Sequence, residues 1–176
     1  MGKRFIALLR GINVGGHNKL PMKELKALLE GMGCSEVVTY IQSGNLIFQH
    51  QATEPGPLAE SIGVEIERVY GFRPEVTLLA PVELETAIAN NPFQTDPGKA
   101  LHFYFLKTPP ALAGLEKLEA LKSPSELFHL TPEVFYLWAP EGVWRSKLAA
   151  KVEACLGVSA TARNGNTVAR LQSMLG

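Results

Sequence analysis

The residues best suited to chemistry in this chain lie in one stretch, Arg10 to Pro21, which reads Arg-Gly-Ile-Asn-Val-Gly-Gly-His-Asn-Lys-Leu-Pro. Its glycines allow positive backbone φ angles and let successive N–H groups turn toward one point. Its Arg, His, Lys and Asn side chains supply further hydrogen-bond donors around that point. A loop of this composition is suited to binding an anion. The alternative is a structural turn whose charged residues face water.

The spacing of the glycines separates this loop from the better-known phosphate loops. Gly11 and Gly16 have the spacing of a Walker-type loop, but His17 and Asn18 follow where that loop has Lys and then Ser or Thr. The lysine for the terminal phosphates and the hydroxyl for magnesium are therefore missing. The stretch predicts an anion nest of main-chain N–H groups. If the protein is an enzyme, His17 is the candidate acid or base.

Two further stretches carry candidate ligand contacts. The turn sequence 42–45 places amide side chains at a strand end, and 145–147 comes where a predicted helix starts and free N–H groups favour negative charge. We interpret the second stretch as the counterpart of the first polar edge in a second copy of the fold. Hairpin formation and a solvated helix face are the structural alternatives. The predicted ligand-binding residues are Arg10, Gly11, Asn13, Gly15, Gly16, His17, Asn18, Lys19, Gln42, Ser43, Gly44, Asn45, Arg145, Ser146 and Lys147.

Hydrophobic periodicity predicts the elements that position these loops. Apolar or alternating runs indicate strands at 5–9, 36–41, 46–49 and 75–80. Helical spacing of apolar residues indicates helices from Pro21 to about 31, at 58–70, and a short one from Pro81. The order β-α-β-β-α-β plus a helix is the ferredoxin-like pattern.

The rest of the chain repeats that order. Strands are predicted at 101–106, 127–130, 134–138 and 158–162, and helices at 112–121, 143–156 and 166–175. We therefore predict an α+β protein with two ferredoxin-like subdomains, residues 1–90 and 100–176, each followed by a short helix. Residues 91–99 form the predicted linker, because their prolines and glycine disfavour helix and strand.

This topology brings distant loops together. In a β-α-β-β-α-β unit the first and second strands run the same way, so the loop after the first strand and the hairpin after the second emerge at one edge, where the last strand begins. Residues 10–19, the turn 42–45 and Arg73 are therefore predicted to be neighbours. Arg163 before the last helix is a weaker candidate contact, and its neighbours Asn164, Asn166 and Thr167 are typical of helix caps.

Composition excludes several classes of protein. Lys+Arg and Asp+Glu are equal at 17, so the surface as a whole does not attract nucleic acid. Asp96 is the sole aspartate, and neither histidines nor cysteines have metal-ligand spacing, so no metal and no cofactor are predicted. The aromatic residues at 103–105 and 135–138 are interpreted as core, since the signature of an RNA-recognition module is missing. The apolar run 5–9 is too short to span a membrane, and we expect a cytoplasmic protein with reduced thiols.

Several long motifs carry a resemblance. At 7–16 with Leu20-Pro21-Met22, and again at 39–45, the chain resembles a bacterial family of unknown function, DUF1697. Residues 140–148 are similar to that family's P-x-G-x-x-x-S-K-L segment, and 162–164 with Thr167-Val168 are similar to its C-terminal signature. Gly165 stands where the family has Trp. The resemblance implies a compact α+β protein of two ferredoxin-like subdomains and brings no established activity, cofactor or partner.

Three functional hypotheses follow from these observations. The first is a protein that binds an anion along the loop 10–21 and the turn 42–45, either a phosphorylated small molecule, a nucleotide or a nucleic-acid phosphate. The second is an enzyme on such a substrate with His17 as acid or base, although no second titratable partner is evident. The third is a structural or protein-interaction module whose polar loops only close the fold. The sequence does not indicate an oligomeric state.

Overall fold

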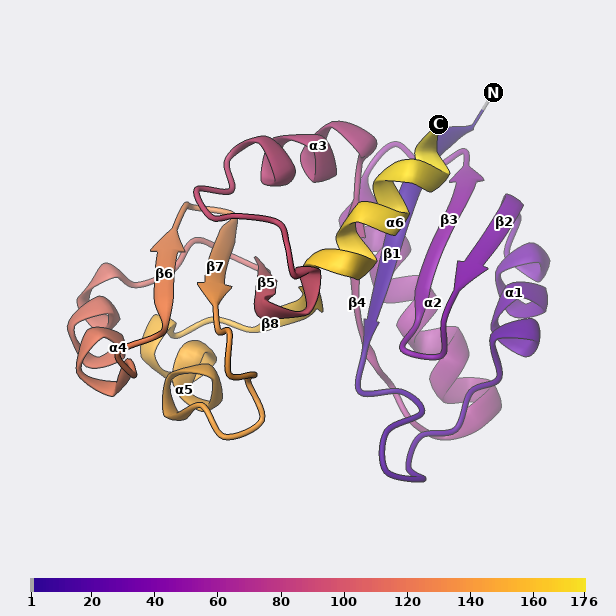
Figure 1. Cartoon of the computed structure of the whole chain (residues 1–176). Helices are drawn as coiled ribbons and strands as arrows, with labels where there is room; N and C mark the ends of the chain where they lie inside the picture. The colour runs from indigo at the N-terminus through magenta and orange to yellow at the C-terminus, as the bar shows by residue number, and fades with distance from the viewer. Residues whose placement is uncertain (1) are drawn as a thin grey trace. The chain divides into compact units, whose positions relative to one another are not determined.

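A computed structural model of the chain describes residues 2–176 (Figure 1). It divides into two compact units. Unit 1 contains the chain up to Glu85 together with Leu171–Gly176, and unit 2 contains Thr86–Arg170. Two helices, α3 (Pro81–Ala89) and α6 (Gly165–Leu175), cross from one unit to the other.

Unit 1 contains one antiparallel sheet with two helices against it. Its elements are β1 (Lys3–Arg10), α1 (Met22–Gly31), β2 (Ser35–Tyr40), β3 (Asn45–His50), α2 (Pro55–Tyr70) and β4 (Glu75–Leu79). The strands lie in the order β2-β3-β1-β4, with β1 paired antiparallel to both β3 and β4. The chain order is thus β-α-β-β-α-β, as predicted.

The core of unit 1 is formed by the sheet and the apolar stripes of its helices. Strand β1 is buried over Phe5–Leu9, in keeping with its apolar residues on both faces. Helix α1 buries Leu25 and Leu29, and α2 buries Ile62 and Ile66, at the helical spacing seen in the sequence. Burial in this core also raises the pKa of the Cys34 thiol to about 11.

The last turn of α6 is fastened to the first strand of unit 1. The Arg4 guanidinium donates hydrogen bonds to the carbonyl oxygens of Leu175, at 2.6 Å, and Met174, at 3.3 Å. Carbonyl groups at the end of a helix lack partners within the helix and carry partial negative charge, so a cation stabilises them. Figure 1 shows α2 behind the sheet of unit 1 and this end of α6 in front of it.

Unit 2 repeats the same order of strands and helices. Its elements are η1 (Gly98–Ala100), β5 (Leu101–Leu106), η2 (Leu112–Gly114), α4 (Leu115–Leu121), β6 (Leu127–Leu130), β7 (Val134–Trp138), α5 (Lys147–Leu156) and β8 (Ala160–Asn164). The strand order is β6-β7-β5-β8, which matches β2-β3-β1-β4 position by position. The prediction of an α+β protein with two similar subdomains is therefore confirmed.

Five aromatic residues of β5 and β7 are core, as interpreted from the sequence. Phe135 and Tyr136 are fully buried, and Phe103, Phe105 and Trp138 are nearly so. Their rings contact one another across neighbouring strands, as between Phe103 and Tyr136 at a centroid distance of 5.3 Å. They are therefore unavailable as a platform for stacking nucleic-acid bases.

Two predicted boundaries in unit 2 are wrong, and each has a local cause. Helix α5 begins at Lys147 and not at 143, because the Ser146 hydroxyl caps it by accepting a hydrogen bond from Ala149 N at 3.0 Å. The last strand is Ala160–Asn164 and not 158–162. Gly157 ends α5 with φ +69°, and the chain needs two further residues before Ala160 N donates to Glu153 Oε1 at 2.8 Å.

Candidate functional site

The loops that follow β1 and β2 meet at one edge of the unit 1 sheet, as the topology predicted. Leu9 N donates to the Gly44 carbonyl oxygen at 2.9 Å, and Asn13 Nδ2 donates to the Gln42 carbonyl oxygen at 2.8 Å. Strand β4 begins at the same edge, where Glu75 is paired with Arg10. The structure thus brings together two stretches that are about thirty residues apart in sequence.

The glycines at the tip of the first loop are explained by a tight turn. Gly15 and Gly16 have φ angles of +57° and +78°, and His17 N donates to the Val14 carbonyl oxygen at 2.9 Å. Two successive central residues with positive φ are the mark of a type I′ turn, which glycine favours. Within residues 2–176 the N–H groups of Gly15 and Gly16 have no hydrogen-bond acceptor. The turn therefore leaves two main-chain donors at an exposed tip, which Figure 1 shows beyond the sheet edge.

Most other donors of this loop are used by the fold itself. Asn13 Nδ2 also donates to the Leu20 carbonyl oxygen at 2.9 Å, and Asn13 Oδ1 accepts from Leu20 N at 2.8 Å. Asn18 Nδ2 donates to the Gly11 carbonyl oxygen at 3.0 Å. We predicted both amides as ligand contacts, but the structure shows them closing the loop. The fully buried side chains of Ile12 and Leu20 anchor it in the core.

The turn after β2 is likewise internal in its bonding. Asn45 is fully buried, and its Nδ2 donates to the Tyr40 carbonyl oxygen and to Ser43 Oγ at 3.1 and 3.0 Å. Gly44 has φ +88°, and a Cβ there would lie 2.8 Å from Ile12 Cδ1. Gly44 is therefore required by close packing, and Asn45 by the turn. The side chains of Gln42 and Ser43 are exposed.

The cations of unit 1 differ in how they are paired. Arg10 lies 3.7 Å from Glu75 in an ion pair, and Arg73 pairs with Glu60 of α2, so Arg73 is turned toward that helix. His17 and Lys19 are exposed, and neither side chain forms a hydrogen bond or ion pair within residues 2–176. His17 has no titratable partner in that range, so the structure offers no acid–base pair at this loop.

The stretch 145–147 lies at a different place in its unit from the one predicted. It belongs to the connection between β7 and α5, and the start of that connection is held by Ala139 N, which donates to the Ala100 carbonyl oxygen at 2.8 Å just before β5. It is thus at the edge where β5 begins, whereas the loop 10–20 is at the edge where β1 ends. The two stretches are not counterparts, and the interpretation as a repeated polar edge is wrong.

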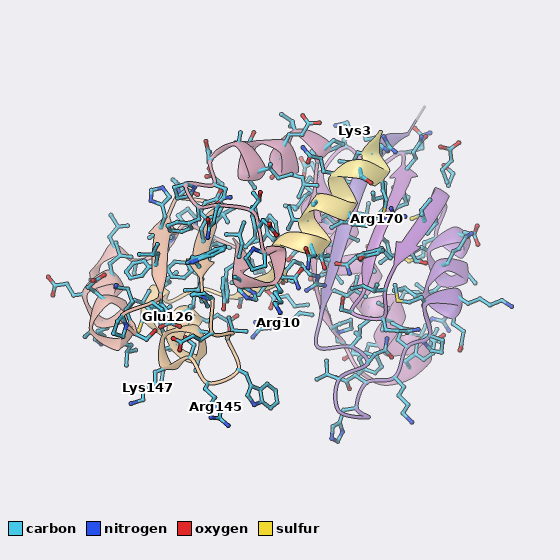
Figure 2. All side chains as sticks on the ribbon, viewed as in Figure 1. Lys3, Arg10, Glu126, Arg145, Lys147 and Arg170 are labelled. Atoms are coloured by element: carbon cyan, nitrogen blue, oxygen red, sulfur yellow. The ribbon has the colours of Figure 1, made fainter. Side chains whose placement is uncertain are left out.

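A cleft of about 670 Å³ opens at this edge of unit 2. It lies between the connection 122–126, which precedes β6, and residues 140–147, which are the end of the connection from β7 and the first residue of α5. Its polar lining residues are Lys122, Ser123, Glu126, Glu141, Arg145, Ser146 and Lys147. Figure 2 shows Glu126, Arg145 and Lys147 together at this end of unit 2.

A buried carboxylate organises the cleft. Glu126 is only 5% exposed, and its two oxygens accept hydrogen bonds from Ser123 N at 2.8 Å and from Ser146 Oγ at 2.5 Å. Ser146 Oγ in turn accepts from Ala149 N, so one serine links the carboxylate to the start of α5. Burial, followed by the charges of Glu126 and Glu153, raises the pKa of the Tyr104 hydroxyl to about 12.

Three cationic side chains surround the cleft without protein partners. Lys122, Arg145 and Lys147 form no side-chain hydrogen bond or ion pair with any residue between 2 and 176. Ser146 and Lys147, which begin α5, also line the cleft, and the start of a helix favours negative charge. The cations are opposed by Glu126 and by Glu141, whose Oε2 accepts from Ser125 Oγ at 2.5 Å. The lining residues therefore sum to one net positive charge.

Sequence reasoning missed Lys122 and Glu126. The stretch Ser-Pro-Ser-Glu at 123–126 has the Ser-x-x-Glu spacing of a capping box, and Glu126 Oε1 does accept from Ser123 N. That signal predicts a local turn. It does not predict that the carboxylate also accepts a hydrogen bond from the hydroxyl of Ser146, twenty residues away.

The start of α6 confirms the capping interpretation. Asn164 Oδ1 accepts from Thr167 N at 3.0 Å. Arg163 is largely desolvated, which lowers the pKa of its guanidinium to about 10. A Cβ at Gly165 would lie 3.0 Å from the Gly98 carbonyl oxygen, so the close approach of these two glycines leaves little room for the Trp expected there by resemblance.

Two classes of site find no support in residues 2–176. No group of three or more His, Cys, Asp or Glu residues is placed to hold a metal ion. In the same range no helix combines the length and the apolar character needed to cross a membrane.

Comparison with known proteins gives a family and a fold. The family model described as "Protein of unknown function (DUF1697)" matches residues 2–136. Among solved structures, the chain is similar to the conserved bacterial protein SP0830 from Streptococcus pneumoniae, with 24% identity, a TM-score of 0.73 and full coverage of both chains. No curated protein matches the chain.

Proposed function

The chain belongs to the DUF1697 family, whose description assigns no activity, and from that premise we propose that it binds an anionic ligand at the cleft of unit 2. The ligand class is a phosphorylated small molecule, a nucleotide or a nucleic-acid phosphate. The observation that supports this proposal is the set of three unpaired cations, Lys122, Arg145 and Lys147, around one concave surface.

The arrangement suits a phosphate for a physical reason. A phosphate accepts several hydrogen bonds at once, and a guanidinium and two ammonium groups can donate to it. The dipole of α5, which begins at Lys147, adds a favourable field for negative charge. The buried Glu126 accepts hydrogen bonds from Ser123 and Ser146, and within residues 2–176 it forms no ion pair with these cations. The cations therefore remain available to a ligand.

The Gly-rich loop of unit 1 is the second candidate site. The exposed N–H groups of Gly15 and Gly16 and the side chains of His17 and Lys19 favour it. The amides of Asn13, Asn18 and Asn45 are already bonded, and Arg10 is paired with Glu75, so fewer donors are left than at the cleft. The enzyme hypothesis based on His17 lacks a titratable partner in residues 2–176 and is the weakest of the alternatives.

The test is a binding experiment that compares variants of cationic residues inside the cleft with a variant of one outside it. Pyrophosphate, sugar phosphates, nucleotides and short RNA are titrated at low salt by calorimetry and by thermal shift. We expect Arg145→Ala and Lys147→Ala each to weaken binding about tenfold, the loss of one charge-assisted hydrogen bond. Lys151→Ala, an exposed charge on the same helix outside the cleft lining, is the control and should change affinity less than about twofold.

The outcomes separate the alternatives. Weakening by Lys19→Ala and not by Lys147→Ala would move the site to the Gly-rich loop. If no phosphate compound binds or raises the melting temperature, the binding proposal fails and the interaction module stands. Turnover of a bound compound that is lost in His17→Ala would favour the enzyme hypothesis.

A further inference from the structure

We propose that Trp144 stacks on the base of a nucleotide whose phosphate is held at the cleft of unit 2, an inference that rests on the proposed function. Trp144 is 93% exposed. Of the strongly exposed large apolar side chains in residues 2–176 it is the only aromatic one, the others being Val, Ile and Leu. Water contact over a whole indole is unfavourable, so a ring displayed in this way is suited to covering by a flat partner.

The backbone that carries this ring is held by main-chain hydrogen bonds on both sides of it. Gly142 N donates to the Ala139 carbonyl oxygen at 2.9 Å, and Ser146 N donates to the Val143 carbonyl oxygen at 3.1 Å. Trp144 is the second residue of the turn that the latter bond closes, and the preceding Val143 packs on the core of unit 2. The ring is thus presented from a hydrogen-bonded turn fixed at both ends, which lowers the ordering cost of binding.

The neighbours of Trp144 can bind the phosphate of a nucleotide whose base stacks on the ring. Arg145 follows it in the same turn, and Gly142 and Arg145 both line the cleft. A nucleoside phosphate joins a planar aromatic ring to an anion within one small molecule, and stacking on an aromatic side chain beside cations is how proteins hold single-stranded nucleic acid. Stacking tolerates any base, because every base has a π-face. The ligand chemistry is therefore a nucleobase with an adjacent phosphate.

A membrane surface fits this region less well. Interfacial binding uses several apolar side chains together on one face, with basic residues around them. Here Trp144 is a single ring, and residues 140–142 of the same loop, Pro, Glu and Gly, add no second large apolar side chain.

The test compares phosphates with and without a base in position-144 variants. Trp144 is exposed and Trp138 buried, so ligands that stack should quench the emission of the wild-type protein and leave that of Trp144→Leu unchanged. We expect adenosine 5′-monophosphate to bind the wild type about tenfold tighter than ribose 5-phosphate. Trp144→Leu should lose that difference and keep its affinity for ribose 5-phosphate, and Trp144→Phe should keep most of the difference.

The possible results show whether the ligand is a free nucleotide or nucleic acid, and which results would contradict the inference. Tighter, Trp144-dependent binding of a single-stranded oligonucleotide than of the mononucleotide indicates nucleic acid, and the reverse indicates a free nucleotide. Equal affinity of wild type for the nucleotide and for ribose 5-phosphate overturns this inference and leaves the proposed function standing. If neither of these compounds, nor the oligonucleotide, nor any phosphate of the first screen binds, the proposed function is overturned. Trp144-dependent binding of anionic phosphatidylserine vesicles without nucleotide binding overturns the inference in favour of a membrane.

Discussion

The loop 10–20 of unit 1 and the loop 139–147 of unit 2 both contain glycine, cationic and hydroxyl or amide residues, yet they use them differently. In unit 1 the Asn13 side chain makes three hydrogen bonds within the protein, and Arg10 is paired with Glu75. In unit 2 the side chains of Arg145 and Lys147 have no partner in residues 2–176. Donors that close a loop contribute to stability, and donors without partners are available for binding.

The largest effect that would test this contrast is expected at Asn13. Asn13→Ala removes three hydrogen bonds at a residue with φ +54°, so we expect the free energy of unfolding to fall by about 4 kcal/mol. Asn18→Ala is the matched control, because Asn18 has φ +52° but makes one side-chain bond, and we expect a loss of about 1.5 kcal/mol. Urea denaturation measures both, and equal losses would show that the Asn13 bonds do not hold the loop.

A second contrast compares two glycines with the same backbone angle. Gly44 has φ +88° and would place a Cβ 2.8 Å from Ile12 Cδ1 and 2.9 Å from Leu9 Cβ, whereas Gly142 has φ +89° and open space around it. We expect Gly44→Ala to cost about 3 kcal/mol and Gly142→Ala about 1 kcal/mol, since only the first adds overpacking to the unfavourable φ. Similar melting temperatures for the two variants would contradict the close packing of unit 1 at this turn.

The smallest effect concerns the two thiols, one in each unit. Cys34 is buried and its pKa is raised to about 11, whereas Cys155 is half-buried, so a thiol reagent at pH 8 should modify Cys155 first. Because the thiol ionises near 9 when unfolded, its contribution to stability is present below pH 9 and is lost as the pH rises toward 11. Stability curves of wild type and Cys34→Ala between pH 8 and 11 should therefore converge. In Cys155→Ala the remaining thiol is Cys34, and in Cys34→Ala it is Cys155. Faster labelling of the first variant than of the second would contradict this expectation.

Local pattern was sufficient to predict the fold where strands are short and bounded by turn residues. The predicted strands at 101–106, 127–130 and 134–138 coincide with β5, β6 and β7, because a proline follows each apolar run within three residues. The start of α5 was placed too early because Val143 continues the helical apolar spacing. The hydroxyl of Ser146, which caps the helix, decides the boundary instead.

The candidate site was less predictable than the fold. Topology alone indicated that the loop after β1 and the turn after β2 meet, and the bond from Asn13 to Gln42 shows that they do. Which donors would remain unpaired depends on distant partners, such as Glu75 for Arg10, that no local motif specifies. A Gly-Gly pair also serves a type I′ turn as well as an anion nest, so the residue types alone could not distinguish the two.

The hydrogen bonds between Arg4 and the last turn of α6 have a consequence for biosynthesis. Unit 1 takes its last six residues, Leu171–Gly176, from beyond the whole of unit 2. A ribosome that has released residues up to Glu85 has therefore delivered the sheet of unit 1, but not the helix end whose carbonyl groups Arg4 binds. Unit 2 emerges as one continuous segment, whereas unit 1, whose sheet is translated first, receives its last six residues only after the second half of the chain has been translated.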